Sequence, residues 1–187
     1  HHFTKMRKKY LLMTKQVNSH EELRKYFKNS KAVFMTGSDQ VWGPVSTGTY
    51  DSAYFLDFVP KGNKKIAFAS SFGKAKFNEK TMKEYKQYLV QYDKIAVRED
   101  KAVEILDDMG IESEQVLDPT LLIDKNEWSK YITKNVVKEE YVLVYQIHND
   151  QKLNAYAKMF AKKSGLKLVR VSPIFHQFKR GGKFVYL

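Results

Sequence analysis

The chain contains no cysteine among its 187 residues. This excludes a disulfide scaffold, a thiolate zinc site and a cysteine nucleophile. No apolar run approaches the roughly 18 to 20 residues that cross a bilayer, and the first thirty residues lack the charged-then-apolar order of a secretion signal. We therefore expect a soluble, cytoplasmic protein.

Several familiar ligand-binding and catalytic motifs are also missing. Neither a Walker loop nor Gly-x-Gly-x-x-Gly follows a predicted strand, and Gly-x-Ser-x-Gly does not occur. Nucleotide hydrolysis, nicotinamide binding and serine hydrolysis are therefore unsupported. His148 and His176 have no acidic or histidine neighbour at the spacing of metal ligands. We expect neither a bound metal nor a cofactor.

Positive charge is abundant, because 33 lysines and arginines stand against 21 acidic residues, for a net charge of +12. Such a balance suggests nucleic acid, an anionic membrane surface or a polyanionic small substrate as partner. No basic stripe carries interleaved aromatic residues, and no nucleic-acid-binding motif occurs, so we expect no nucleic acid. A solvated, lysine-rich surface explains the charge equally well.

The apolar residues, 43% of the chain, suffice for one ordinary core or for parts of two. Short apolar runs predict strands at 32–36, 65–70, 94–97, 115–117, 141–147 and 166–171. Between them, helices are predicted to begin at the capping residues Ser19, Asn78 and Asp150 or Asn149. This alternation predicts an α/β fold of Rossmann-like layers, with parallel strands and helices on both faces.

The domain organisation follows from a break in this pattern. Residues 3–124 are predicted to form a partial first Rossmann-like domain, 125–140 a linker, and 141–187 the start of a second, truncated one. His1 and His2 resemble the remnant of an expression tag and are left out. One β-α-β unit is too small to stand alone, so we expect further sequence beyond it.

Polar residues follow the first predicted strand, where ligands bind in open parallel sheets. Gly37 would let the backbone approach a ligand, while Ser38, Asp39 and Gln40 could bind the hydroxyls of a sugar. In a second interpretation, Ser38 and Asp39 cap a helical turn and Trp42 packs in the core.

Later strand ends add further candidates. Arg98 precedes a helix and could grip a phosphate or carboxylate, although an ion pair with Glu99 or Asp100 explains it equally well. Ser70 and Ser71, at the end of the second predicted strand, could supply hydroxyl groups to a polar ligand. Asp118 ends the fourth strand and could reach an interdomain cleft, but Asp before Pro is also a common turn starter.

Taken together and in order, four segments resemble the polysaccharide pyruvyl transferase family. They are Gly-Ser-Asp-Gln-Val-Trp at 37–42, Ile-Ala-Phe-Ala-Ser-Ser-Phe-Gly at 66–73, Val-Arg-Glu at 97–99 and Val-Leu-Asp-Pro-Thr-Leu-Leu at 116–122. The likeness is strong over roughly 34–128 and weak over the strand-helix-strand that follows. Four ordered motifs are far more specific than any one of them.

The resemblance implies an incomplete two-domain, glycosyltransferase-B-like architecture. It implies transfer of the enolpyruvyl carbons of phosphoenolpyruvate, the donor substrate, to two sugar hydroxyls, forming a pyruvate ketal and releasing phosphate. The acceptor would be a saccharide or lipid-linked glycan destined for the cell surface, handled in the cytosol. A basic surface would suit peripheral contact with the inner face of an anionic membrane.

The resemblance also assigns roles to residues. Arg98 corresponds to the family's arginine in Val-Arg-Glu, which we expect to hold the phosphate or carboxylate of the donor. Asp39 and Gln40 match the Ser-Asp-Gln-Val-Trp motif, and we assign them to the acceptor sugar or to shaping the cleft. Gly37, Ser38, Ser70, Ser71 and Asp118 complete the predicted substrate-binding set.

The chain departs from the family in two places. The family opens with a strand and a glycine-bearing turn upstream of these segments, and its second domain carries a Ser-Phe-His-Gly motif; neither is present. Because that histidine is the family's best general-acid candidate, we expect this chain to be inactive by itself. A second hypothesis is a noncatalytic carbohydrate-binding or scaffolding module in polysaccharide biosynthesis.

Overall fold

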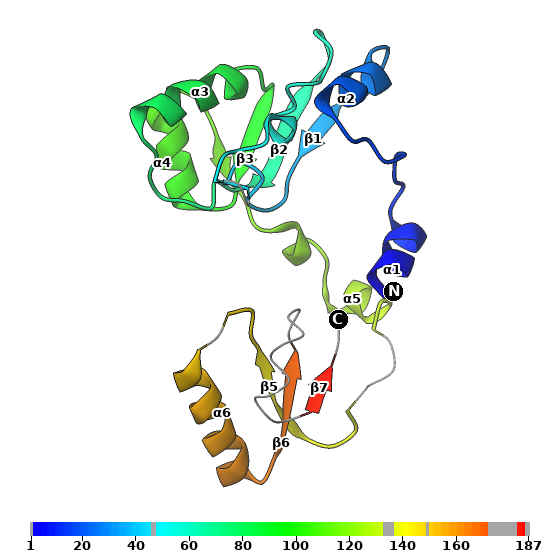
Figure 1. Ribbon diagram of the computed structural model, residues 1–187, viewed down its shortest axis with the longest axis vertical. Coiled ribbons are helices and arrows are strands. Elements are labelled where there is room, and N and C mark those ends of the chain that lie inside the picture. Colours follow the sequence, from blue (N-terminus) through cyan, green and yellow to red (C-terminus); the bar gives the residue numbers. More distant parts are fainter. Residues whose placement is uncertain (1, 46–47, 133–136, 149, 172–182, 186–187) are drawn as a thin grey trace. The chain divides into compact units, whose positions relative to one another are not determined.

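The computed structural model describes residues 2–45, 48–132, 137–148, 150–171 and 183–185. The chain divides into two compact units (Figure 1), one made of 15–130 and the other of 1–14 with 131–187. The boundary at 130 falls inside the predicted linker. Residues 3–14 differ from the prediction, because they group with the C-terminal unit rather than with the first domain.

The 15–130 unit contains a four-stranded parallel sheet in the order β1-β2-β3-β4. Its strands are β1 (Phe34–Thr36), β2 (Lys65–Ser70), β3 (Lys94–Val97) and β4 (Glu114–Gln115). Its helices are α2 (His20–Phe27), α3 (Glu79–Leu89), α4 (Asp100–Asp108) and α5 (Lys125–Ser129), with 3₁₀ turns at Ser52–Phe55 and Pro119–Leu121. The predicted α/β fold with parallel strands is confirmed.

The predicted helix starts are also present, each with a side-chain oxygen accepting a backbone N–H of the first turn. Ser19 Oγ accepts from Glu22 N at 3.1 Å, and Asn78 Oδ1 accepts from Thr81 N at 2.8 Å. In the other unit, Asp150 Oδ1 caps α6 through Leu153 N at 2.9 Å, which decides between the two predicted caps. Such bonds satisfy amides that the helix itself leaves without a partner.

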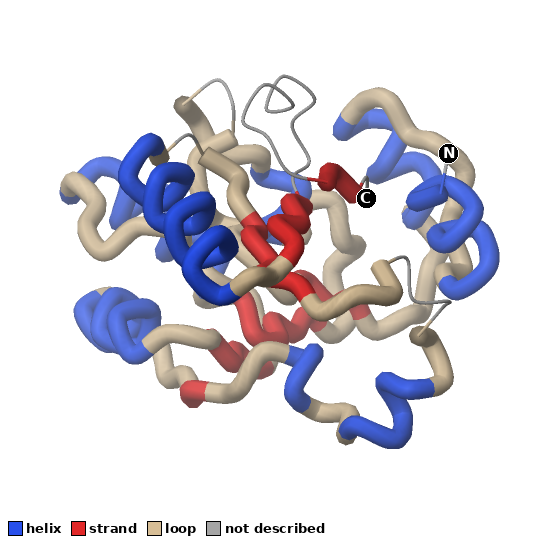
Figure 2. The backbone as a smooth tube through the Cα atoms, turned by 90° about the horizontal axis from the view of Figure 1, so that it is seen from below, coloured by secondary structure: helices blue, strands red, loops and turns tan. Residues whose placement is uncertain are grey.

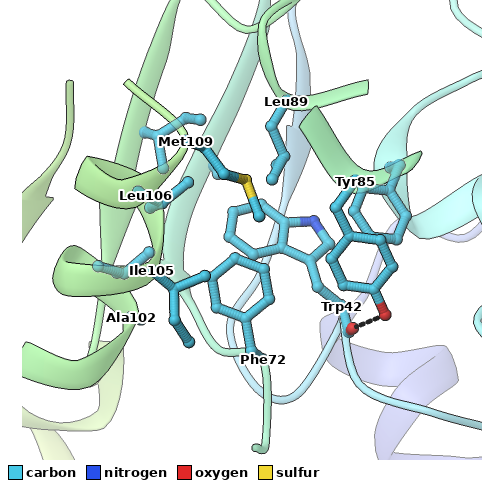
Figure 3. Close-up of a cluster of buried hydrophobic side chains, with 12 residues drawn as sticks. Trp42, Phe72, Tyr85, Leu89, Ala102, Ile105, Leu106 and Met109 are labelled. Atoms are coloured by element: carbon cyan, nitrogen blue, oxygen red, sulfur yellow. Dashed lines mark hydrogen bonds between the residues drawn. The ribbon is translucent and has the colours of Figure 1, made fainter. Parts of the chain in front are cut away.

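The core of the 15–130 unit is centred on Trp42, whose side chain is fully buried. Figure 3 shows its indole among Phe72, Tyr85 and side chains of α4 such as Leu106. The Tyr85 hydroxyl donates to the Trp42 carbonyl at 2.8 Å, and burial raises the pKa of Tyr85 to about 12, so the phenol keeps its proton. The loop after β1 is thus tied into the core at its far end.

Helix packing in this unit corrects one prediction. Both α3 and α4 pack against the sheet face that carries Ala67, Ile95 and Val97. On the opposite face Met35 is 60% exposed, and its pairing partner Ile66 is half-buried. Among the described residues of this unit, these two helices therefore cover one face, whereas alternation along the sequence predicted cover on both.

The other unit contains β5 (Tyr141–Tyr145), β6 (Lys167–Val171) and β7 (Lys183–Val185), paired in parallel in that order. Helix α6 (Gln151–Ser164) packs alongside β5 and β6 (Figures 1 and 2) and ends at Gly165, whose φ of 67° is left-handed. Helix α1 (His2–Tyr10) belongs to the same unit. The sequence did not predict β7, because three residues after a glycine pair show no measurable period.

Candidate functional site

The loop 37–42 leaves the carboxyl end of β1 in a conformation that requires glycine at its first position. Gly37 has a φ of +130°, and a Cβ there would stand 2.0 Å from the carbonyl oxygen of Phe68. Phe68 lies where β2 bulges relative to β3, because the register of that pair shifts between Ala67 and Ser70. The sequence predicted that Gly37 lets the backbone approach a ligand; in the structure Gly37 instead permits close contact with the backbone of β2.

Asp39 combines a fixed backbone with an exposed side chain. Its carbonyl accepts from Ser71 N at 2.8 Å and from Val41 N at 2.7 Å, and it forms an isolated parallel bridge with Ser70. Its φ of 122° is uncommon for a residue other than glycine. The Asp39 carboxylate is nevertheless 78% exposed. The backbone therefore holds the position while the carboxylate remains available to partners.

Ser70, which ends β2, and Ser71, which follows it, do not face solvent. Ser70 is fully buried, and its hydroxyl donates to the Thr36 carbonyl at 3.2 Å. Ser71 is 3% exposed, and its Oγ accepts from Gly73 N at 3.1 Å. Both hydroxyls brace the loops that end β1 and β2. The sequence predicted that Ser70 and Ser71 bind substrate, whereas in the structure both hydroxyls already form hydrogen bonds inside the protein.

Gln40 and Ser38 are exposed beside this framework. The Gln40 side chain lies close to Gly73, because a Cβ added to that glycine would stand 2.7 Å from Gln40 Oε1. Of the two interpretations of the loop, core packing of Trp42 is confirmed. The Asp39 carboxylate, however, faces Arg98 rather than capping a helical turn.

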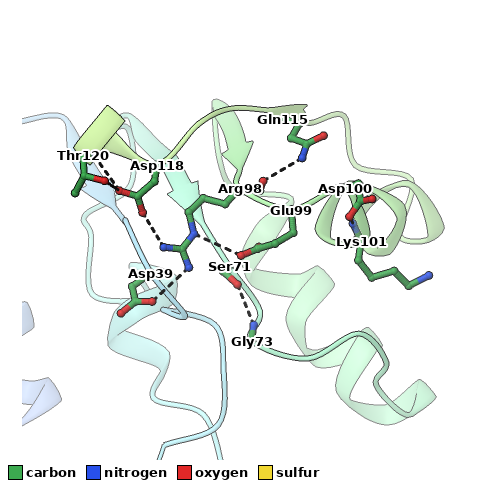
Figure 4. A network of polar contacts seen from close by, with 10 residues as sticks. All are labelled: Asp39, Ser71, Gly73, Arg98, Glu99, Asp100, Lys101, Gln115, Asp118 and Thr120. Atoms are coloured by element: carbon green, nitrogen blue, oxygen red, sulfur yellow. Dashed lines mark hydrogen bonds and ion pairs between the residues drawn. The ribbon is translucent and has the colours of Figure 1, made fainter. Parts of the chain in front are cut away.

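Arg98 follows β3 and lies among three carboxylates (Figure 4). Its Nη1 donates to Asp118 Oδ2 at 2.9 Å, its Nη2 lies 3.4 Å from Asp39 Oδ1, and its Nε lies 3.4 Å from Glu99 Oε1. The Arg98 side chain is 22% exposed. The structure therefore brings together Asp39, Arg98 and Asp118, which the sequence singled out separately, and it also confirms the ion pair with Glu99.

The contacts of Arg98 are unequal. The 2.9 Å bond to Asp118 has the length of a charge-assisted hydrogen bond, whereas 3.4 Å is long for one. Burial alone lowers the pKa of the Arg98 guanidinium, but the Asp118 bond and the charges of Glu99 and Asp39 outweigh it and raise that pKa above its ordinary value. Arg98 is thus a permanent cation held chiefly by Asp118.

Asp118 is itself anchored from the other side. Its Oδ1 accepts from Thr120 N at 2.9 Å and from the Thr120 hydroxyl at 2.7 Å, at the start of the turn Pro119–Leu121. These bonds from Thr120 and the bond from Arg98 lower the pKa of Asp118. Asp118 therefore both starts the turn and holds Arg98, because Oδ1 accepts the bonds from Thr120 while Oδ2 accepts the bond from Arg98.

Residues of this cluster line two hollows. One of about 540 Å³ is lined by residues that follow β3 and β4, including Arg98, Glu99, Leu117 and Asp118. Another, of about 270 Å³, is lined by Gln40, Ser71 to Ala75, Glu99, Lys101 and Ala102. Ligand-sized space therefore adjoins the guanidinium at the carboxyl edge of the sheet, where parallel sheets bind ligands.

Two residues of the cluster were not predicted from the sequence. Thr120 fixes Asp118, and Gln115 donates through Nε2 to the Arg98 carbonyl at 3.1 Å. The spacing Asp-Pro-Thr could have indicated the first, because a hydroxyl two residues after Asp often bonds its carboxylate. Among the described residues no cluster of acidic residues and histidines could hold a metal ion. His148 is exposed, and His176 lies outside the described residues.

The fold and the site together define an α/β protein with parallel sheets and a polar, guanidinium-centred cluster at the carboxyl ends of its strands. A family model described as polysaccharide pyruvyl transferase matches residues 2–185. The chain belongs to the polysaccharide pyruvyl transferase family, as the four motifs predicted.

A search of solved structures found a structure of UDP-N-acetylglucosamine 2-epimerase from Rickettsia bellii, with 11% sequence identity and a TM-score of 0.46. The match covers 90% of this chain and 49% of that protein, so the chain spans about half its length. No curated protein sequence matches the chain. Within the described residues, no helix is both long enough and apolar enough to cross a membrane.

Proposed function

We propose that the protein transfers a pyruvyl group from phosphoenolpyruvate to two hydroxyls of a sugar in a cell-surface glycan, forming a ketal. Membership of the family supports transfer of a pyruvyl group to a polysaccharide. The observation that carries the proposal for this chain is the Arg98 guanidinium, held at the carboxyl edge of the sheet beside an exposed carboxylate and an open hollow.

The chemistry defines what the site must supply. The methylene carbon of the donor gains a proton and becomes a methyl group, while the bond from the central carbon to the phosphate oxygen breaks. Two sugar oxygens bond to that central carbon, and of their two protons one balances the new methyl group and the other leaves with phosphate. A cation that binds the donor's charges and a proton donor are therefore required.

Arg98 fits the first requirement. The donor carries a carboxylate and a phosphate, and a guanidinium matches either with paired N–H groups. Asp118 occupies Nη1 and fixes the guanidinium, so Nη2 and Nε are the groups that we assign to the donor. A guanidinium that is already fixed loses less conformational entropy when a ligand binds than a freely rotating side chain does.

Asp39 and Gln40 are assigned to the acceptor. Carboxylate and amide oxygens accept hydrogen bonds from sugar hydroxyls, and both side chains are exposed beside Arg98 or the adjacent hollow. The acceptor is a saccharide or a lipid-linked glycan. The net charge of +12 supports a cytoplasmic protein that contacts the inner face of an anionic membrane.

Isothermal titration with phosphoenolpyruvate tests this function. Arg98→Ala should abolish the binding that the unaltered protein shows. Arg24→Ala is the matched control, because it removes the same charge from an ion pair with Asp57 at 2.8 Å and leaves the Arg98 cluster intact. Equal donor affinity in the Arg98 variant would contradict the assignment. Binding of glycans without any binding of phosphoenolpyruvate would favour the noncatalytic module instead.

A further inference from the structure

Arg98 Nη2, one of the two guanidinium nitrogens that we assign to the donor, already faces a carboxylate of the protein. Asp39 Oδ1 lies 3.4 Å from Arg98 Nη2, on the side of the guanidinium opposite the anchoring bond to Asp118. Figure 4 shows Asp39 and Asp118 approaching the two terminal nitrogens from different elements. An anion that approaches Nη2 from this side therefore meets the Asp39 carboxylate.

We propose that Asp39 is an internal competitor for the donor site: it occupies Arg98 Nη2 in the unliganded protein, and the donor's carboxylate or phosphate displaces it. The displaced carboxylate then accepts a hydrogen bond from an acceptor hydroxyl. This inference rests on the proposed function, because it specifies how the same cluster handles donor and acceptor. It makes Asp39 the residue that links the binding of one substrate to the binding of the other.

The geometry explains why Asp39 moves and Asp118 stays. Asp118 has a 2.9 Å bond to Arg98 and two further bonds from Thr120, and it is 31% exposed. Asp39 has a 3.4 Å contact and is 78% exposed, so water replaces its lost partner at little cost. Its backbone is held by bonds to Ser71 and Val41, so that only side-chain torsions need to change.

The charges explain why the exchange is needed. Asp39, Glu99 and Asp118 place three negative charges around one positive charge, and a further anion at Nη2 would be repelled while Asp39 remained there. Rotation of the Asp39 carboxylate into solvent relieves that repulsion. The cluster thus favours binding of the donor before the acceptor, since both oxygens of the Asp39 carboxylate become available to the acceptor once it leaves Arg98.

The test compares donor affinity in the unaltered protein, Asp39→Asn and Asp100→Asn by isothermal titration with phosphoenolpyruvate. Asn keeps the size of Asp and tolerates a positive φ, so the loop should stay folded. Asp39→Asn should bind the donor about two- to fivefold more tightly, the range expected when an exposed ion pair no longer competes. Asp100→Asn removes the same charge from a side chain turned away from Arg98, and it should change affinity less than about twofold.

Acceptor binding provides a second measurement, because this chain is expected to be inactive by itself. In the presence of phosphoenolpyruvate, Asp39→Asn should bind a saccharide acceptor less tightly than the unaltered protein, since the variant releases the donor site but binds the acceptor hydroxyl less well. A purely structural role would not tighten donor binding. Equal or weaker donor affinity in Asp39→Asn would refute the competition while leaving the proposed function intact. A protein that binds no phosphoenolpyruvate at all would refute the proposed function, and the competition with it.

Discussion

Replacing Gly37 by alanine is the sharpest test of how the candidate site is built. The new Cβ would stand 2.0 Å from Phe68 O, 3.0 Å from the carbonyl carbon and 3.2 Å from Ser70 Oγ. The first of these lies well over 1 Å inside the ~3.5 Å separation of atoms in contact. Because the obstacle is backbone of the β2 bulge, no side chain can rotate to make room.

The cost can be worked from two contributions. A φ of +130° is rare for residues with a Cβ and costs of order 1–3 kcal/mol. Forcing the loop away from β2 adds the cost of overpacking, typically about 1–3 kcal/mol. We therefore expect Gly37→Ala to lower the free energy of unfolding of the 15–130 unit by about 2–6 kcal/mol. At about 3–5 °C per kcal/mol, its Tm should fall by about 6–30 °C.

Tryptophan fluorescence during urea and thermal unfolding measures this loss, because both tryptophans of the chain, Trp42 and Trp128, lie in the 15–130 unit. Gly62→Ala is the matched control. Gly62 has a φ of +88° and no atom within 4 Å of an added Cβ, so only the backbone cost of about 1–2 kcal/mol remains. Equal losses in the two variants would show that the contact between Gly37 and the β2 bulge is unimportant.

Three further substitutions test the framework around the site. Asn78→Ala should destabilise the 15–130 unit by about 1 kcal/mol in urea unfolding, because the amide at the start of α3 loses its side-chain acceptor. Tyr85→Phe should cost about 1–2 kcal/mol in the same assay, since the buried carbonyl of Trp42 loses its donor. The pKa of Asp118 is lowered in the folded protein, so its ionisation stabilises the fold above its ordinary pKa of 3.8, and this contribution is lost as the pH falls through the lower folded value. Unfolding at pH 7 and pH 3 should therefore show Asp118→Asn to be destabilising at pH 7 and much less so at pH 3.

Each of these has a contrary outcome. Unchanged stability of Asn78→Ala would mean that water replaces the cap without loss. A neutral Tyr85→Phe would show that the Trp42 carbonyl finds another donor. A constant difference between the unaltered protein and Asp118→Asn at both pH values would mean that the carboxylate contributes through something other than its charge.

Much of the fold could be predicted from short-range patterns. The predicted strands at 65–70 and 94–97 contain the apolar runs 66–69 and 95–97, and the structure places β2 and β3 over those ranges. Helix starts at Ser19 and Asn78 were readable because a capping side chain bonds an amide only three residues away. The motif residues Asp39, Arg98 and Asp118 were found for the same reason, since each follows a recognisable strand.

The rest depended on contacts between distant segments. Ser70 and Ser71 look like exposed hydroxyls in the sequence, but the bulge of β2 and the loop after β1 bury them. The packing of α3 and α4 on one face, and the grouping of residues 1–14 with the C-terminal unit, leave no trace in local periodicity. Each outcome depends on which surfaces meet, and residue spacing does not encode that.

The sequence by itself determined the class of fold, the family and the residues at the strand ends, because apolar period, capping and motif order are local properties of the chain. Only the tertiary structure decided that Asp39, Glu99 and Asp118 converge on one guanidinium, with contacts of 3.4, 3.4 and 2.9 Å. Asp39 and Arg98 are 59 positions apart, and parallel pairing of β1, β2 and β3 brings their strand ends to the same edge. Convergence at that edge makes Arg98 a held cation rather than a free one, and it places the exposed Asp39 carboxylate against Arg98 Nη2, where we propose that a donor competes with it.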